Sequence, residues 1–484
     1  MARIAHFKKI LKDDFFEKIK FFSEFLSARD IIDVAAAENY RWRNRIWTPI
    51  QTLWAFLVQV LEPNCSCREA VARTLAEQAA CGQQVTVSPD PSAYCQGRQR
   101  LPLSLFKSAL QQVGQRLQAK VGSAYSWCGR RVWIVDGSTC SMPDTPSLQQ
   151  SFGQPDGQKP GCGFPVARIV AMFCWATGAI LDVAIGAYRS SELRLWHQLW
   201  GQLHTGDIVL GDRFFCAYSY LAELLQKGCD GVFRLHGARS RTVDFRRGKR
   251  LGKNDRLVTW YRPKQCPRGL SAERFASLPE TLTIRVLRFH TMVPGFRDET
   301  IIVATTLLNP KEYSFEEIAG LYRDRWIVEL RLRDIKTTLG MDILRGKSAD
   351  VVRKEIYMYL LVYNLIRVLM WQASEAHDQP LHRMSFAGTL QRVNAVLPYL
   401  WLFSGTQKAV VLYQYLLNWI ARDKLPYRPN RIEPRAVKRR PKEYALLNKP
   451  RSEMREALYN ENCLSSCHSS VFPFLCRLYN HFIG

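Results

Sequence analysis

Three acidic residues of this 484-residue chain, Asp136, Asp212 and Glu329, are the side chains best suited to chemistry. Two of them each end a short, apolar, β-branched run, at 131–136 and 206–212. Carboxylate oxygens are the ligands that Mg²⁺ or Mn²⁺ prefers, and the lack of Cys or His partners argues against zinc. Paired ions of this kind activate an oxygen nucleophile and stabilise the leaving oxygen of a phosphodiester. The three carboxylates therefore indicate metal-dependent phosphodiester chemistry.

The two apolar runs read as buried strands, which must place the two aspartates. Sites in open α/β sheets form at the carboxyl ends of strands, so we expect Asp136 and Asp212 to close neighbouring strands. Asp207 enters the second run from its opposite end and is not a candidate. Each aspartate alone is also compatible with a capping role in a turn.

The third carboxylate lies on a predicted helix that begins at a capping box, Ser314 with Glu317, and stops at Gly340. At 3.6 residues per turn, four polar side chains share one stripe at the margin of an apolar face. These residues are Tyr322, Arg325, Glu329 and Lys336.

Two interpretations of this stripe stay open on geometry alone. A carboxylate with a cation on either side fits a metal and phosphate site, whereas Arg325 and Glu329 at i,i+4 also fit an ordinary helix salt bridge. Asp324 and Arg331 fall on the opposite side of the helix, which we expect to be solvated.

The charge of the chain indicates a polyanionic partner. Lys and Arg total 68 against 43 Asp and Glu, a net charge of +25, and nucleic acid is the leading candidate. A membrane is the weaker candidate, because the longest apolar stretch, 356–371, is interrupted by Asn364 and Arg367. The basic N-terminus has no apolar signal core after it. We therefore expect no membrane association and a cytoplasmic location alongside DNA.

Strand and helix patterns alternate after residue 126, which predicts a mixed α/β sheet. The β-rich part, 237–311, contains a basic stretch at 239–250, and a basic arm lies at 428–440. The role of the final 25 residues is left open. We divide the chain into a helical DNA-binding domain (1–125), an α/β unit (126–236 and 312–375), the β-rich insertion (237–311) and a C-terminal helical region with the basic arm (376–484).

The spacing Tyr322-x2-Arg325-x3-Glu329-x6-Lys336 resembles the signature of DDE transposases of the insertion sequence 4 family, the cut-and-paste enzymes of bacterial mobile elements. Asp136-Gly-Ser-Thr and Gly211-Asp212-Arg213 resemble the two aspartate blocks of that family. The resemblance covers about residues 40–450 and includes further stretches at 94–102, 345–348, 363–367 and 431–439.

The resemblance implies an RNase H-like catalytic domain, interrupted by the β-rich insertion and preceded by the helical DNA-binding domain. It implies that Asp136, Asp212 and Glu329 hold two Mg²⁺ ions. Tyr322, Arg325 and Lys336 would hold phosphates of the element end. Similar enzymes nick the end, form and reopen a hairpin, and join the end to target DNA. A homodimer synapsing two double-stranded ends is also implied.

Hairpin formation in that family places a flipped base on a tryptophan of the β-rich insertion, which makes Trp260 a candidate DNA contact. Trp260 is equally compatible with a strand residue that packs on the sheet, and we favour that interpretation.

Two other functions compete with transposition. A nuclease or resolvase on the same fold would cut DNA without joining it, and a non-catalytic DNA-binding protein would have lost the chemistry. The presence of all three carboxylates, Asp136, Asp212 and Glu329, argues for an enzyme.

Overall fold

The computed structural model describes residues 23–426 and 449–465, apart from short gaps at 44, 63, 81, 83–86, 123–125, 268–269 and 292–298. The predicted basic arm at 428–440 and most of the final 25 residues lie outside the described residues.

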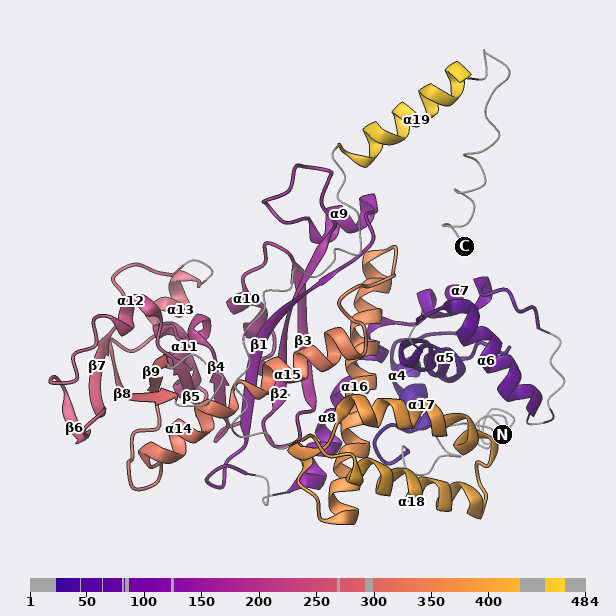
Figure 1. The fold of residues 1–484 in the computed structure, drawn as a ribbon. Coiled ribbons are helices and arrows are strands. Elements are labelled where there is room, and N and C mark those ends of the chain that lie inside the picture. Colours follow the sequence, from indigo (N-terminus) through magenta and orange to yellow (C-terminus); the bar gives the residue numbers. More distant parts are fainter. Residues whose placement is uncertain are drawn as a thin grey trace.

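A single nine-stranded sheet runs through the molecule in the order β3-β2-β1-β4-β5-β9-β8-β7-β6 (Figure 1). The first three strands form an antiparallel meander, and β4 and β5 lie parallel to β1. The sheet is mixed, as expected, although no strand order was predicted from the sequence. The strands are β1 Val132–Ser141, β2 Val166–Cys174, β3 Ile180–Ala187, β4 Ile208–Gly211, β5 Asp230–Arg234, β6 Lys249–Gly252, β7 Asp255–Tyr261, β8 Thr281–Thr291 and β9 Glu299–Thr305.

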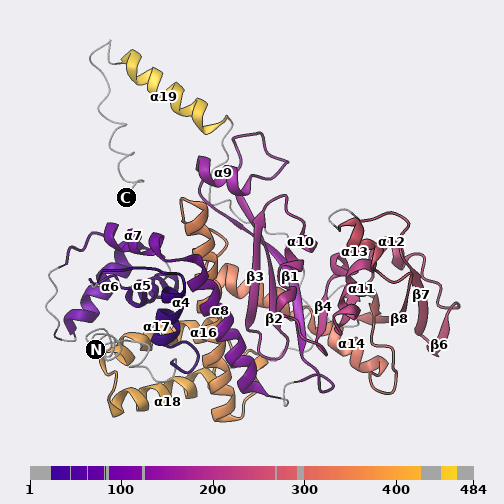
Figure 2. The ribbon, with the colours of Figure 1, turned by 180° about the vertical axis from the view of Figure 1, so that it is seen from behind.

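The four strands of the β-rich insertion extend the same sheet rather than forming a separate one. β9 pairs antiparallel with β5, with Val232 opposite Thr305 and Arg234 opposite Val303. Figure 2 shows the insertion strands at one end of the molecule and the helical regions at the other. The sheet therefore connects two parts of the protein that lie far apart.

Helices cover both faces of the sheet. On one face lie α8, α15 and α16, and on the other lie α10 and α11. The helices are α4 Ala28–Ala37, α5 Pro49–Leu61, α6 Cys67–Ala80, α7 Ser92–Arg100, α8 Leu103–Val121, α9 Pro146–Phe152, α10 Glu192–His197, α11 Tyr218–Gln226, α12 Gly237–Ser240, α13 Ala272–Ala276, α14 Phe315–Asp324, α15 Ile327–Arg333, α16 Ala349–His377, α17 Phe386–Leu402, α18 Gln407–Arg422 and α19 Arg451–Ser465.

The long helix α16 joins the helical regions to the sheet. By length and composition it is apolar enough to cross a membrane, but 89% of its apolar window is buried inside the protein. It packs against α5, α8, α17 and α18 and against β3. α16 is therefore a core helix of this fold.

The prediction that Asp136 closes a strand is wrong in one respect, because β1 continues to Ser141. Pairing of β1 with β4 does end at Val135 opposite Gly211, while pairing with the longer β2 carries β1 onward. Asp136 therefore lies in mid-strand, one residue beyond the end of β4. The apolar run at 131–136 indicates the buried part of β1. It cannot show that β2 is long enough to pair with the residues that follow.

The predicted single helix is interrupted. α14 begins at the Ser314–Glu317 capping box, as expected, and α15 follows after a break at Arg325 and Trp326. A π-helical turn, Asp334–Thr338, then leads to Gly340, whose φ of +85° ends the element.

The prediction that Arg331 is solvated is also wrong. Its guanidinium is buried and donates to the carbonyls of Cys174 (2.9 Å) and Trp175 (2.8 Å). The turn after β2 covers the side of α15 that a helix on an open surface would expose to water. An amphipathic pattern shows one packed face and cannot reveal a second neighbour on the other side.

Candidate active site

Asp136 and Asp212 lie on adjacent strands, near the carboxyl end of β4. Asp136 follows the last residue of β1 that pairs with β4, and Asp212 follows the last residue of β4. One oxygen of Asp136 accepts from the Gly137 N–H at 2.9 Å. Asp212 Oδ1 accepts from the Phe214 N–H at 2.8 Å and begins a 3-10 turn. The capping role of Asp212 is thus present alongside its position at the candidate site.

The electrostatics of Asp136 link the three carboxylates. Burial raises the pKa of Asp136 to about 6; Arg325 and the Gly137 N–H oppose this rise, and the Asp212 and Glu329 carboxylates add to it. The negative charges of Asp212 and Glu329 therefore both disfavour the ionised form of Asp136. Carboxylate oxygens are hard ligands, and a divalent cation near Asp136 would offset this unfavourable interaction.

Glu329 of α15 is turned toward Arg325, in the break that precedes this helix. Its side chain is 58% exposed, and Arg325 Nη2 lies 3.2 Å from its Oε1. Within the described parts of the chain, no three Asp, Glu, His or Cys side chains are already grouped as a metal site. The helix salt bridge that was left open as an interpretation is thus present. A three-carboxylate site requires Glu329 to leave Arg325.

Tyr322 and Lys336 also have protein partners. Tyr322 is fully buried, and its ring packs edge-on against Phe289 and Trp326, with centroids 6.4 and 5.9 Å away. Lys336 Nζ forms an ion pair with Asp342 Oδ1 at 2.9 Å. The four residues of the polar stripe therefore occupy different environments, from the core at Tyr322 to the exposed Glu329.

The structure does not bring Trp260 to the carboxylates. It lies in β7, four strand positions from β4, or about 19 Å at the usual spacing. Its half-buried ring packs on the core of the sheet face that α10 and α11 cover, and the guanidinium carbon of Arg239 lies 4.6 Å from the ring centroid. The packing role of Trp260 is present, while base stacking stays a prediction.

Known proteins resemble the chain over the region that contains this site. The Transposase DDE domain family matches residues 127–365. The transposase InsG of insertion sequence element IS4 from Escherichia coli K12 is 26% identical over 367 residues, 73% of this chain and 78% of that protein. The putative transposase InsL of IS186A, also from Escherichia coli K12, is 37% identical over 274 residues, 51% of this chain and 68% of that protein. The chain belongs to the IS4 family of DDE transposases.

The chain is thus a DNA transposase, an enzyme that acts on DNA. Among solved structures, a piggyBac transposase synaptic complex with hairpin DNA matches with a TM-score of 0.43 and 9% identity, covering 83% of this chain and 85% of that one.

The transposase has a fourth carboxylate close to Asp136, which was not predicted from the sequence. Glu192 begins α10, and a Cβ at Gly137 would lie only 2.8 Å from its carboxyl carbon. Arg168 Nη1 lies 3.5 Å from Glu192 Oε1. Burial raises the pKa of Glu192, Arg168 opposes the rise, and Asp212 adds to it. The glycine after Asp136 was the available signal, because it leaves room for another side chain.

Proposed function

We propose that this transposase binds the ends of its element, cleaves them in a reaction that depends on Mg²⁺ or Mn²⁺, and joins them to target DNA. The electrostatic coupling of Asp212 and Glu329 to the buried Asp136 carries the proposal. Two aspartates on adjacent strands, with the charge of Glu329 also acting on Asp136, support a metal-binding role more strongly than a capping role, which only Asp212 performs.

Asp136, Asp212 and Glu329 would hold the metal. When bound, a pair of such ions supplies the positive charge that activates an oxygen nucleophile and stabilises the leaving oxygen. Arg325 neutralises Glu329 in the free protein, and it becomes available for a phosphate once Glu329 turns toward the two aspartates. Arg325 would then pair with Glu329 in the free protein and with a phosphate in the complex with DNA.

DNA binding would use the same helices. Tyr322, Arg325 and Lys336 would hold phosphates of the double-stranded element end, with Lys336 exchanging Asp342 for a phosphate oxygen. Cleavage through a hairpin would place a flipped base on Trp260, which requires Arg239 to leave the face of the ring.

The parts of the chain would divide this work. Residues 1–125 would form the DNA-binding domain, 126–236 and 312–375 the catalytic domain, 237–311 its insertion, and 376–484 the C-terminal region with the basic arm. A homodimer would synapse the two ends, in the cytoplasm of a bacterium and on its nucleoid.

The test replaces Glu329 with Gln, which keeps the shape of the side chain and removes its charge. With element-end DNA, Mg²⁺ and a target plasmid, Glu329→Gln should abolish cleavage and joining, while gel-shift binding of the end stays measurable. Glu316→Gln, an exposed change on the neighbouring helix α14, is the matched control and should react normally. Undiminished cleavage by Glu329→Gln would refute the site.

The same assay separates transposition from cutting alone. Joining of the ends to the plasmid by wild-type protein would support the complete transposition reaction. Products that are cleaved and never joined would favour the nuclease or resolvase alternative. Binding without cleavage at any Mg²⁺ or Mn²⁺ concentration would favour a non-catalytic DNA-binding protein.

A further inference from the structure

The insertion has a basic surface that the proposed chemistry does not use. Seven of the residues 239–254 are Lys or Arg, and Asp244 is the one acidic residue among them. Six of the seven are exposed in the structure: Arg241, Arg246, Arg247, Lys249, Arg250 and Lys253. Asp244 pairs with Arg246 at 3.1 Å and so neutralises only part of this charge.

The loop that presents these cations is anchored to the sheet. Phe245 is buried, and the guanidinium carbon of Arg288 lies 4.5 Å from its ring centroid. Arg256 Nε donates to the Phe245 carbonyl at 2.6 Å, and Arg288 Nη2 donates to Asn254 Oδ1 at 3.0 Å. The backbone that presents the cations therefore needs little ordering when a ligand binds, which lowers that part of the entropy cost of binding.

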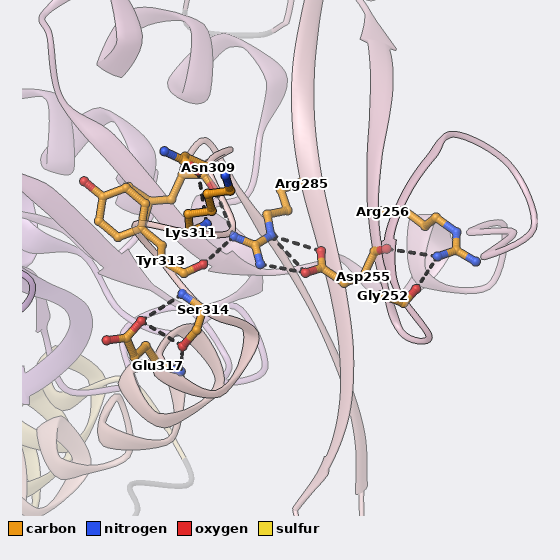
Figure 3. Close-up of polar contacts among 10 residues, drawn as sticks. Gly252, Asp255, Arg256, Arg285, Asn309, Lys311, Tyr313, Ser314 and Glu317 are labelled. Atoms are coloured by element: carbon orange, nitrogen blue, oxygen red, sulfur yellow. Dashed lines mark hydrogen bonds and ion pairs between the residues drawn. The ribbon is translucent and has the colours of Figure 1, made fainter.

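The strands beneath this loop are tied together by a buried ion pair. Arg285 Nη2 of β8 lies 2.6 Å from Asp255 Oδ2 of β7, and Arg285 Nη1 also donates to the Tyr313 carbonyl at 2.7 Å (Figure 3). Figure 3 also shows Arg256 donating to the carbonyls of Gly252 and Asp255 in the turn between β6 and β7.

Three hollows that share lining residues lie between the loop and Arg213. The outermost, of about 500 Å³, is lined by Arg246, Arg250 and Lys253. It shares Val243 and Asp244 with a hollow of about 690 Å³ that contains Arg239 and Arg247.

This second hollow shares Leu235 with a third, of about 230 Å³, lined by Arg213 and Arg234. Arg213 directly follows Asp212. We call this series of hollows, from Arg213 to Lys253, the basic track.

We propose that the basic track binds the phosphate backbone of the donor duplex that flanks the element, on the far side of the scissile phosphate from the element end. The inference rests on the proposed function. The polar stripe expected to hold the element end belongs to α14 and α15, whose buried residues join the core on one face of the sheet. Val243 and Trp260 of the basic track pack on the core of the opposite face. Asp212 directly follows β4, whose side chains contribute to both cores. Arg213, which lines the nearest hollow, directly follows Asp212, so a duplex that extends from the site on this side would meet the basic track.

The sheet order sets the reach of this contact. From β4 to β6 there are five strand steps, about 24 Å at the usual spacing. At about 3.4 Å per base pair this distance corresponds to roughly 7 base pairs. Flanking DNA shorter than this should not contact the outermost cations.

The test uses the full-length protein with Arg246, Arg247, Arg250 and Lys253 all changed to Ala. Binding is measured against salt for element ends that carry a long flank, a flank of about 3 base pairs, or none. The long flank should add affinity and steepen the salt dependence for wild type, because each neutralised phosphate contributes about 0.9 to the slope. The variant should lose that added affinity and up to about 3.6 units of slope on the long flank, and bind the end without a flank as wild type does.

A control variant removes four exposed cations elsewhere, Lys311, Lys408, Arg422 and Lys424, and should keep the dependence on flank length. Equal weakening of the basic-track variant with and without a flank would overturn the proposal. So would a flank that adds nothing to wild-type binding, or a defect confined to target joining. Wild-type protein that binds the long flank more tightly and never cleaves would refute the proposed function and leave the basic track intact.

Discussion

The carboxyl group of Asp136 makes the stability of the protein depend on pH. Its raised pKa means that the folded protein holds the proton of this carboxyl more tightly than the unfolded chain does. The folded state is therefore stabilised as pH falls below about 6 and loses that stabilisation as pH rises through the same value. Burial is the main cause of the raised pKa, and a bound cation would offset the smaller contribution from the Asp212 and Glu329 charges.

Replacing Asp136 by Asn should abolish cleavage and stabilise the metal-free protein at high pH. With a pKa of about 6 in the folded state and a reference value of 3.8, wild type should lose about 1.4 kcal/mol of its free energy of unfolding between about pH 5 and pH 8. Urea titration in EDTA gives the free energy of unfolding of the variant minus that of wild type. This difference should be larger at pH 8 than at pH 5 by about that amount. An equal effect at both values would mean that Asp136 is not the titrating group.

At the scale of elements, the turn between β2 and β3 is held in place by α15 and α16. Gly178 has a φ of +77°, and a Cβ there would lie within about 3 Å of Arg331 and Arg367. Asn364 accepts from the Ile180 N–H and donates to its carbonyl, both at 2.7 Å. Much of the stretch 363–367, one basis of the family resemblance, is therefore structural.

Asn364→Ala should lower the free energy of unfolding by about 2–4 kcal/mol, because both backbone groups of Ile180 stay buried without that partner. Asn394→Ala removes one bond, to the Leu61 carbonyl, at a half-buried position and should cost about 1 kcal/mol. Urea unfolding of the two variants gives the comparison. Similar losses would mean that the turn is not held through Asn364.

Several of these elements could be predicted from the sequence because their signals are local. The Ser314–Glu317 cap, the Gly340 stop and the turn at Thr177 and Gly178 each depend on residues close along the chain. The extent of β1 depends on β2, and the burial of Arg331 depends on the turn after β2. Glu192 was missed because its proximity to Asp212 depends on how α10 packs on the sheet. Contacts between distant segments leave no local pattern.

Across the whole molecule, the insertion shares a sheet with the strands that carry Asp136 and Asp212. The Asp255–Arg285 ion pair lies inside this shared structure, with side chains 5% and 0% exposed. The bond from Arg285 to the Tyr313 carbonyl links the pair to the segment that leads into α14. Damage to the insertion should therefore also destabilise the strands that carry Asp136 and Asp212.

Asp255→Ala leaves Arg285 buried without its counter-charge and should destabilise the protein by about 3–5 kcal/mol. Amide hydrogen exchange should then speed up in β4 and β5 as well as in β7 and β8, because one sheet opens as a unit. Asp156→Ala is the control, since it breaks an ion pair with Arg189 whose side chains are 64% and 81% exposed, and should cost under about 1 kcal/mol. Faster exchange confined to β7 and β8 would show that the insertion opens alone.

The outermost strand of the described sheet, β6, has a consequence for how the protein behaves in solution. An edge strand offers unpaired N–H and C=O groups to any other chain, and a short, charged edge discourages such pairing. β6 has four residues, of which Lys249 and Arg250 are exposed cations. Mutual repulsion between these charged edges should keep two molecules from joining their sheets into aggregates.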